Sequence, residues 1–283
     1  MTDYSRSFRL GAATTTLINV GDGQVNLAEM LDVPASEWSP RYASSFDQPI
    51  RAPFQCVHLR LSAMSILVDA SSYPLPDSPY AKFALPNYQP PPGLLAQLAE
   101  VGVNPEEVTH VVFTHWHWDH HSGATVERGG YYIPCFPNAR HYLGRADWES
   151  EDTQKAMRDP NAMESRTLAV LHQRGLLDLV EGNHELCAGI QIIAAPGESP
   201  GHQIVRVHSE GRTLYCLGDL YHHPVEVEQP SWSTRWADAK ASLSSRQSLA
   251  ETALIEQSLL IAGHISGVGR LHRTPSGVSW SAI

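Results

Sequence analysis

The chain has 283 residues, of which 42% are apolar, and a formal net charge of −10 from 30 acidic and 20 basic residues. This length suits one large domain with a substantial core, and the composition excludes the fibrous and disordered classes. An acidic chain without a basic run does not fit a nucleic-acid-binding protein, because phosphate groups are neutralised by clustered lysines and arginines.

No segment has the pattern of a secretory leader or of a membrane span. The N-terminus lacks an apolar stretch behind a basic start, and no window approaches the roughly 18 apolar residues that a membrane crossing needs. The four cysteines, Cys56, Cys135, Cys187 and Cys216, are widely spaced and form no C-x-x-C pair. We therefore expect reduced thiols and a cytoplasmic protein with no membrane partner.

Strand patterns dominate the first part of the chain. Residues 8–20 and 24–28 predict short strands or a hairpin, whereas 31–53 is rich in proline and serine and predicts a loop. Two apolar runs follow, at 54–61 and 64–71, and a tight turn between them would complete a β-hairpin.

A proline-rich segment and a helix follow this hairpin. Residues 72–92 contain seven prolines, which predicts a long surface loop. Its aromatic residues Tyr80, Phe83 and Tyr88 fit either an apolar cover over a site or an anchor for the loop, and the sequence leaves both open. Leucines and a valine at helical spacing predict a helix over 94–103.

The remaining chain alternates between strand and helix patterns. It predicts strands at 108–114 and 139–144, helical structure at 146–175, four strands between 176 and 219, a helix at 237–258, and strands from 259 to the C-terminus. No linker divides the chain, so we expect one domain over 1–283. It would carry an N-terminal extension (about 1–53) and a helical insertion (about 146–175). The pattern suggests two sheets with helices on their outer faces.

The densest chemical signal follows the apolar strand 108–114. There the sequence T-H-W-H-W-D-H-H contains His115, His117, Asp119 and His120. Two histidines separated by one residue at a strand end can point the same way. Imidazole and carboxylate groups are ligands of zinc and similar divalent ions, so this pattern predicts a metal site.

Three more candidate ligands lie where other predicted strands end. His202 follows a Gly-Pro turn, and Asp219 and His264 each close an apolar strand. Strand ends that converge on one rim are where α/β enzymes assemble their sites. The two oxygens of Asp219 would allow it to bridge a pair of ions.

In this order, the motifs resemble those of the metallo-β-lactamase-like hydrolases. They are T-H-x-H-x-D-H, P-G-x-x-P-G-H, G-D and A-G-H, and the resemblance runs from residue 54 to the C-terminus. It implies an αββα sandwich of two mixed β-sheets with helices on the outer faces. It also implies two divalent metal ions, zinc first, with Mn, Fe and Co as alternatives. One ion would be held by His115, His117 and His202 and the other by Asp119, His120 and His264, with Asp219 between them and Asp69 supporting the ligand histidines.

The chain departs from the family pattern at Glu198, where a histidine that is not normally a ligand is common. His117 stands where the flavodiiron oxidoreductases have glutamate, which favours hydrolysis. Asp219 stands where the true β-lactamases use other residues. The segment 218–232 and the N-terminal extension are similar to the lactonase and methyl-parathion hydrolase branch.

The resemblance also implies a mechanism. Two ions would lower the pKa of a water between them, and the resulting hydroxide would attack the substrate, with Asp119 orienting it and moving its proton. Tyr221 and His222, beside Asp219, are candidate hydrogen-bond donors to the developing oxyanion. His222 and His223 also fit exposed loop residues, and the sequence favours that interpretation.

We therefore expect a hydrolase that opens a lactone or cleaves a carboxylic ester of a small molecule. The alternatives are a phosphotriester hydrolase, a thioesterase of the glyoxalase II type, and a mononuclear iron oxidoreductase. Packing is the expected role of Trp116 and Trp118, with a pocket wall as the alternative, and His121 is expected beside the ligands or in solvent. A homodimer is possible if the apolar residues Leu10, Leu17, Ile18 and Val20 are exposed.

Overall fold

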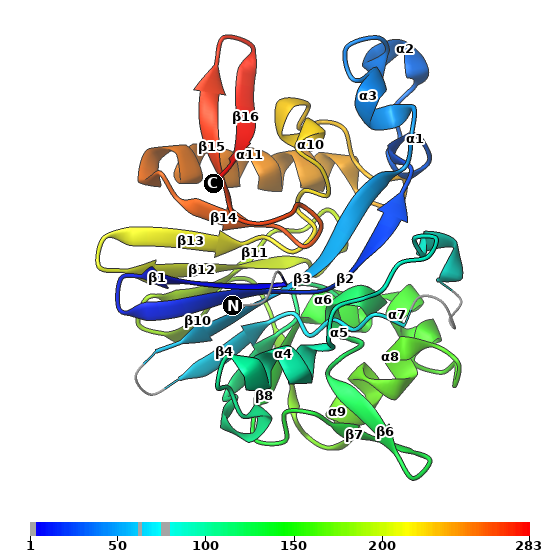
Figure 1. Ribbon diagram of the computed structural model, residues 1–283, viewed down its shortest axis with the longest axis vertical. Coiled ribbons are helices and arrows are strands. Elements are labelled where there is room, and N and C mark those ends of the chain that lie inside the picture. The colour runs from blue at the N-terminus through cyan, green and yellow to red at the C-terminus, as the bar shows by residue number, and fades with distance from the viewer. Residues whose placement is uncertain (1–3, 62–63, 75–79) are drawn as a thin grey trace.

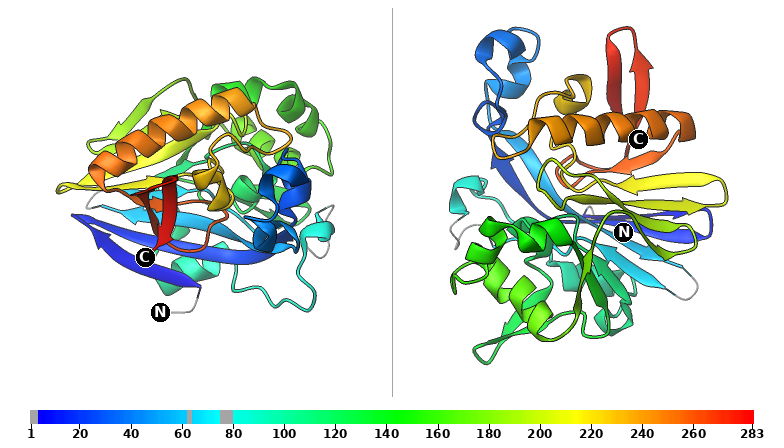
Figure 2. Two further views of the ribbon diagram at one scale, coloured as in Figure 1. Left: turned by 90° about the horizontal axis from the view of Figure 1, so that it is seen from above. Right: turned by 180° about the vertical axis from the view of Figure 1, so that it is seen from behind.

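The computed structural model describes residues 4–61, 64–74 and 80–283, and it contains two seven-stranded sheets. The sheets lie face to face, with the long helix α11 (Ala239–Glu256) covering the outer side of one and shorter helices covering the other (Figure 1). The views from above and behind show the same layers (Figure 2). This arrangement confirms the expected αββα sandwich.

The first sheet is built mainly from the N-terminal half of the chain. Strands β1 to β4 pair antiparallel, whereas β4, β5, β8 and β9 run parallel to one another. The sheet is therefore mixed, as expected. Its strands, in spatial order, are β1 (Ser5–Leu10), β2 (Ala13–Val25), β3 (Ile50–Arg60), β4 (Ser65–Val68), β5 (His110–Val112), β8 (Arg140–Gly144) and β9 (Leu177–Val180).

The second sheet follows the chain order throughout. All its neighbouring strands pair antiparallel except β13 and β14, which are parallel because α11 connects them. Its strands are β10 (His184–Cys187), β11 (Ile190–Ala194), β12 (Gln203–Ser209), β13 (Arg212–Cys216), β14 (Leu259–Ile261), β15 (Gly269–Thr274) and β16 (Gly277–Ala282). A separate hairpin pairs β6 (Thr125–Arg128) with β7 (Tyr131–Pro134).

Short helices occupy the connections between the strands. The expected helical stretch between β8 and β9 is present as four short helices, α6 to α9, rather than one or two long ones. The helices other than α11 are α1 (Leu27–Met30), α2 (Ala35–Trp38), α3 (Ala43–Phe46), α4 (Leu94–Glu100), α5 (Trp118–His121), α6 (Arg145–Glu149), α7 (Glu151–Ala156), α8 (Met163–Arg166), α9 (Leu168–Gln173) and α10 (Val225–Glu228), with 3-10 turns η2 (Ala81–Phe83) and η3 (Pro105–Glu107).

A buried core lies between the two sheets. Leu59 and Val112 of the first sheet belong to the same buried cluster as Val205 and Leu214 of the second. Burial of these aliphatic side chains removes apolar surface from water and fixes the relative position of the sheets. The strand ends that precede the predicted ligands therefore start from a rigid frame.

Two expectations for the N-terminal part need correction. The segment 31–53 is not a plain loop, because it contains α2 and α3 and the start of β3. The apolar residues Leu10, Leu17, Ile18 and Val20 are buried, so they do not offer the exposed dimer contact that the sequence suggested. The tight turn expected between β3 and β4 includes residues outside the described part of the chain.

The division into a single domain with an extension and an insertion stays a prediction. Among the residues that the structure describes, no helix combines the length and apolar character that a membrane crossing requires.

Candidate metal centre

Four loops that carry the predicted ligands meet at one edge of the sandwich. They follow β5, β11, β13 and β14, and backbone hydrogen bonds join them, from Gln203 N to Thr114 O at 2.8 Å and from Gly263 N to Gly218 O at 2.7 Å. Gly218 has a φ of +51°, and a Cβ there would lie 2.4 Å from Thr114 Oγ1. Only glycine adopts this conformation at such close approach without strain.

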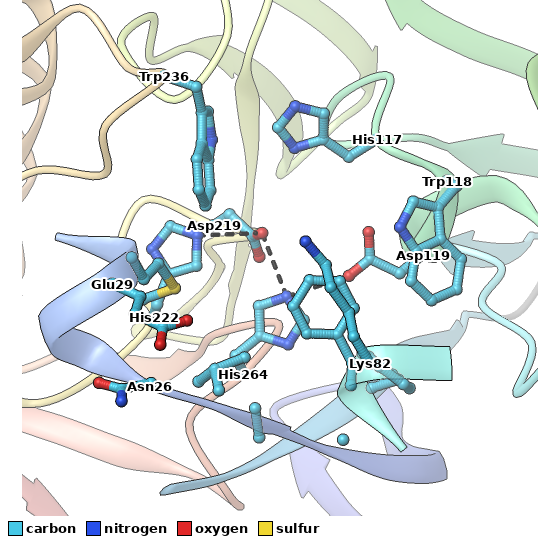
Figure 3. A pocket seen from close by; sticks show the side chains of 16 residues that line it. Asn26, Glu29, Lys82, His117, Trp118, Asp119, Asp219, His222, Trp236 and His264 are labelled. Atoms are coloured by element: carbon cyan, nitrogen blue, oxygen red, sulfur yellow. Dashed lines mark ion pairs between the residues drawn. The ribbon is translucent and has the colours of Figure 1, made fainter. Parts of the chain in front are cut away.

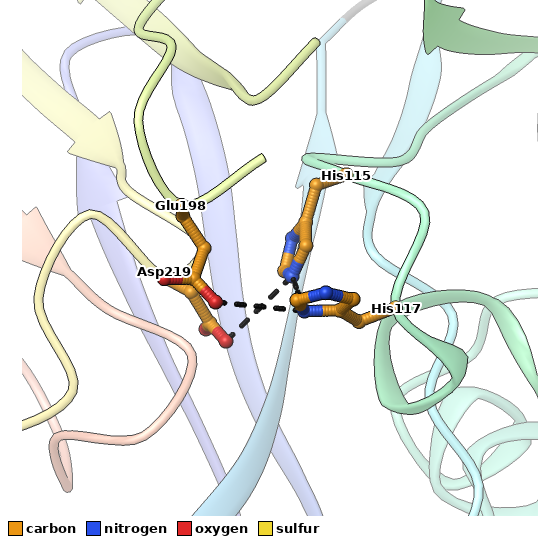
Figure 4. Close-up of side chains that lie close together, drawn as sticks. All are labelled: His115, His117, Glu198 and Asp219. Carbon is orange, nitrogen blue, oxygen red and sulfur yellow. Dashed lines mark hydrogen bonds and ion pairs between the residues drawn. The ribbon is translucent and has the colours of Figure 1, made fainter. Parts of the chain in front are cut away.

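The first group of donor atoms belongs to His115, His117, Glu198 and Asp219, and these atoms all lie within 4.8 Å of one another (Figure 4). Nε2 of His115 is 2.8 Å from Nδ1 of His117 and 3.7 Å from Oδ2 of Asp219. Oε1 of Glu198 is 3.5 Å from Nδ1 of His117. Two imidazoles thus face two carboxylates across a small space.

The second group contains Asp119, His120 and His264. Nε2 of His264 lies 3.3 Å from Oδ2 of Asp119. Oδ2 of Asp219 lies 3.2 Å from Nε2 of His120 and 3.2 Å from Nε2 of His264. Asp219 therefore adjoins both groups, and its role as the bridging carboxylate stays a prediction.

Two polar atoms of the donor groups are buried without a hydrogen-bond partner, Nε2 of His120 and Oδ1 of Asp219. Such atoms are rare in folded proteins, and a bound cation would satisfy both.

The protonation states at this centre also suit metal binding. Burial lowers the pKa of His115 well below its usual value, which keeps its imidazole in the neutral form that binds metals. Burial raises the pKa of Asp219, but His120 and His264 outweigh it and hold that pKa well below its usual value. The residues fit a pair of divalent ions.

His202 lies beside the first group but does not join it. Its Nδ1 is 3.0 Å from the carbonyl oxygen of Ala195, and its Nε2 accepts a hydrogen bond of 3.2 Å from the backbone N–H of Asp219. Its ring centroid is 5.2 Å from that of His115. Nε2 is thus the unprotonated nitrogen, and the role of His202 as a ligand stays a prediction.

Asp69 supports the second group from behind, as the resemblance implied. Its carboxylate accepts hydrogen bonds from Nδ1 of His120 at 2.8 Å, from Thr114 N at 2.7 Å and from Thr114 Oγ1 at 3.0 Å. A hydrogen bond at Nδ1 fixes the imidazole orientation and leaves Nε2 free for a metal.

Glu198 is the residue that sequence reasoning left out. Its side chain is buried and accepts hydrogen bonds from Thr234 Oγ1 at 3.0 Å and from Trp236 Nε1 at 2.5 Å. These contacts direct the carboxylate toward His117. The only signal was the departure from the family pattern, in which the usual residue at this position is not a ligand.

The two candidate oxyanion donors differ in position. His222 is buried rather than exposed, with Nε2 3.3 Å from Oδ2 of Asp219 and Nδ1 3.5 Å from Oε2 of Glu226. Tyr221 points away into the core, where its ring packs under the guanidinium of Arg246 and its hydroxyl contacts the Arg246 carbonyl. Successive residues of this loop face opposite sides, so Tyr221 is wrong as an oxyanion donor and His222 stays a candidate.

His121 is turned away from the donor atoms. Its ring nitrogens lie 2.9 Å from the carbonyl oxygen of Trp116 and 2.6 Å from Oγ1 of Thr167, with Glu164 at 3.6 Å. It therefore supports the loop that carries the ligands, and it is not solvated. His223 is only partly buried.

A pocket of about 400 Å³ opens above the donor atoms (Figure 3). His117, Asp119, Asp219, His222 and His264 form its polar floor. Apolar side chains form much of its walls, and Lys82 and Glu29 add one charge of each sign. The wall residues include Met30, Phe54, Phe83, Trp118 and Trp236.

The three aromatic residues of the proline-rich loop have different roles. Phe83 lines the pocket, and Tyr80 stacks on the pocket residue Trp118 with ring centroids 4.1 Å apart. Tyr88 anchors the loop, because its hydroxyl donates to Asp22 at 2.7 Å. Trp118 is therefore a pocket wall, whereas Trp116 packs against the buried core.

Comparison with known proteins agrees with this geometry. An N-acyl homoserine lactonase of Bacillus cereus is 25% identical over 167 residues, which cover 59% of this chain and 60% of that protein. The N-acyl homoserine lactonase AttM of Azorhizobium caulinodans is 27% identical over 166 residues, covering 56% of this chain and 60% of that protein. The chain thus spans about 60% of the length of these lactonases.

Solved structures show the same fold over nearly the whole chain. The hydrolase AbOPH, of the beta lactamase superfamily, has a TM-score of 0.79 at 16% identity and covers 100% of this chain and 98% of its own. AidC, a dizinc quorum-quenching lactonase, has a TM-score of 0.77 at 16% identity, covering 99% of this chain and 97% of its own. The sequence model of the metallo-beta-lactamase superfamily matches residues 66–264, which include both donor groups. The chain therefore belongs to the metallo-beta-lactamase superfamily.

Proposed function

We propose that this protein is a hydrolase that uses two divalent ions to open lactones or to cleave carboxylic esters of small molecules. The observation that carries the proposal is the position of Asp219, whose Oδ2 approaches histidines of both donor groups at the floor of a pocket. Similarity to N-acyl homoserine lactonases supports lactones as the first substrate class.

In this proposal, the predicted ligands retain their assignments and Glu198 adds a carboxylate to the first group. Zinc is the first choice, because nitrogen and oxygen donors suit it, with Mn, Fe and Co as alternatives. When bound, the ions would polarise the substrate carbonyl group and lower the pKa of nearby water. His115, His117 and His202 would hold one ion, Asp119, His120 and His264 would hold the other, and Asp219 would serve both.

Two side chains on the pocket floor are proposed to handle the proton and the developing charge. Asp119 lines the pocket and takes the proton of the attacking water, then returns it to the leaving oxygen. His222 donates a hydrogen bond to the substrate oxygen on which charge develops. The Glu226 carboxylate accepts a hydrogen bond of 2.6 Å from the backbone N–H of His222, which restrains the position of this residue, and it lies 3.5 Å from the other ring nitrogen.

The pocket walls are proposed to bind the apolar part of the substrate. Met30, Phe54, Phe83 and Trp118 surround the space above the floor and would exclude water from an acyl chain. Burial of each methylene group of such a chain contributes roughly 0.8 kcal/mol. Affinity should therefore rise with chain length until the pocket is full.

The test is hydrolysis of a series of acyl lactones by zinc- or manganese-loaded protein, followed by proton release. We expect turnover that rises with acyl length. Asp219→Ala should abolish it, whereas Asp178→Asn should leave it unchanged, because this partly exposed residue of β9 pairs with Arg140 and does not line the pocket. A protein that binds two ions and turns over no lactone or ester would contradict the proposal.

The alternatives have separate outcomes in the same assay. Turnover of aryl phosphotriesters or of thioesters in preference to lactones would assign the protein to one of those hydrolase classes. A single bound iron with a coloured protein would indicate the oxidoreductase. The second donor group, with Asp119, His120 and His264, favours two ions over one.

A further inference from the structure

Asp147 is a fully buried carboxylate outside the donor groups, on helix α6 directly after β8. Its Oδ2 accepts hydrogen bonds from Trp116 N at 3.1 Å and from Ser199 Oγ at 2.8 Å. Its Oδ1 accepts one from Gly201 N at 2.6 Å. Three donors thus converge on one buried side chain that the proposed chemistry does not use.

These donors belong to two different ligand-bearing loops. Trp116 lies between His115 and His117, after a strand of the first sheet. Ser199 and Gly201 lie between Glu198 and His202, after a strand of the second sheet. The carboxylate of Asp147 therefore joins the loops of the two sheets at the first donor group.

The packing around Asp147 leaves no room for a side chain at two glycines. A Cβ at Gly201 would lie 2.4 Å from Asp147 N. A Cβ at Gly144 would lie 2.0 Å from the carbonyl oxygen of Gly201. Both glycines allow the second loop to approach α6 closely enough for the hydrogen bonds to form.

We propose that Asp147 is a positioning residue that sets the distance between the two loops holding the first metal ion. This inference rests on the proposed metal centre, but not on any particular substrate. Asp147 does for the first donor group what Asp69 does for the second, since each carboxylate accepts backbone and side-chain hydrogen bonds beside the ligands. Groups that orient metal ligands in this way affect metal affinity by about 10- to 100-fold.

An asparagine at position 147 cannot make the same contacts. All three partners are donors, and an amide offers one acceptor oxygen in place of two. Either Gly201 N or the pair of Trp116 N and Ser199 Oγ would face the amide NH₂ group. The two loops would then move apart or leave a buried N–H unpaired.

The experiment compares the wild type with Asp147→Asn, Ser199→Ala and Asp178→Asn, the last being a surface Asp→Asn control. Zinc affinity is measured by competition with a chromogenic chelator, and the absorption spectrum of the cobalt-loaded protein reports ligand geometry. The melting temperature of the metal-free protein measures stability separately.

We expect Asp147→Asn to weaken one of the two binding steps by about 10- to 100-fold and to change the cobalt spectrum. Ser199→Ala, which removes one donor of three, should have a smaller effect in the same direction, and it keeps the test valid if the asparagine variant fails to fold. Wild-type affinity and spectrum in both variants would overturn the inference, even if the melting temperature fell. If the wild type binds two ions but hydrolyses no lactone or ester, the proposed function fails and this inference is still decided by the metal titration.

Discussion

Oε1 of Glu198 lies 3.5 Å from Nδ1 of His117, so the first donor group contains a second buried carboxylate besides that of Asp219. The usual residue of the family pattern at this position, histidine, would bring no charge. Two carboxylates near one ion increase its electrostatic stabilisation and favour ions that prefer oxygen ligands, such as Mn²⁺.

Glu198→Gln should therefore weaken the binding of one ion by about tenfold, and more for Mn²⁺ than for Zn²⁺, because the amide keeps the size of the side chain and removes its charge. Competition with a chelator measures both affinities. Glu107→Gln, an exposed change on η3, is the matched control. Equal affinities in Glu198→Gln and the wild type would mean that Glu198 only holds Thr234 and Trp236.

The buried pair of Glu226 and Arg246 holds the loop that carries Asp219 and His222. Nη2 of Arg246 lies 2.6 Å from Oε1 of Glu226, and its Nε donates to the carbonyl oxygen of Leu220 at 2.8 Å. Burial alone would raise the pKa of Glu226, but the positive charges of Arg246 and His222 have the larger effect and lower this pKa to about 2. The stabilisation is thus present above the unfolded-state pKa and is lost only as the pH falls toward about 2.

Glu226→Gln should destabilise the fold by about 3–5 kcal/mol, because it leaves the Arg246 charge buried without a counter-ion. Urea unfolding of the metal-free protein at neutral pH measures this loss. Glu228→Gln, on the same helix α10 but partly exposed, should cost less than about 1 kcal/mol. Similar losses in the two variants would show that the buried pair does not stabilise the loop.

Asp147 predicts a specific pH dependence of stability. Burial raises its pKa from 3.8 to about 6, although Ser199 and Gly201 partly oppose the rise. Between pH 3.8 and about 6, the Asp147 carboxyl group is therefore more often protonated in the folded protein than in the unfolded chain. This proton uptake increases the free energy of unfolding as the pH falls through 6, and it adds nothing above that pH.

Relative to Asp147→Asn, the metal-free wild type should gain roughly 1 kcal/mol of unfolding free energy between pH 7 and pH 5. Urea unfolding of both proteins at the two pH values measures this difference and cancels the titration of all other groups. A constant difference would mean that Asp147 has an ordinary pKa in the folded protein.

Much of the centre was predictable because its residues follow apolar strands. His115, His117, Asp219 and His264 each come within a few residues of a strand that the sequence marks by hydrophobicity. Strand ends on the same edge of a sandwich must converge, so chain order and strand pattern together indicate the site. The same pattern suggested two sheets with outer helices, and the family resemblance implied the αββα sandwich.

The remaining residues depend on loop conformation, which periodicity does not encode. Tyr221 and His222 are adjacent, and only the backbone of their loop decides that the tyrosine meets Arg246 and the histidine meets Asp219. Asp147 reaches Gly201 across a contact between distant segments. The short helices α2 and α3 were missed because the proline- and serine-rich segment lacks an apolar period.

Phe83 should determine how well long acyl chains bind. It lines the pocket, and the loop that carries it is fixed by the Tyr88–Asp22 hydrogen bond and by a bridge between Gly23 and Ala84. Phe83→Ala removes an apolar wall, which should raise the KM of long-chain lactones about tenfold, equivalent to roughly 1.4 kcal/mol, and that of short-chain lactones much less. Steady-state kinetics on both substrates measures the ratio.

The control is Tyr131→Ala, which truncates an exposed aromatic side chain on β7 and should leave both KM values unchanged. An equal rise for short and long chains would place the acyl group elsewhere in the pocket, against Met30 or Trp236.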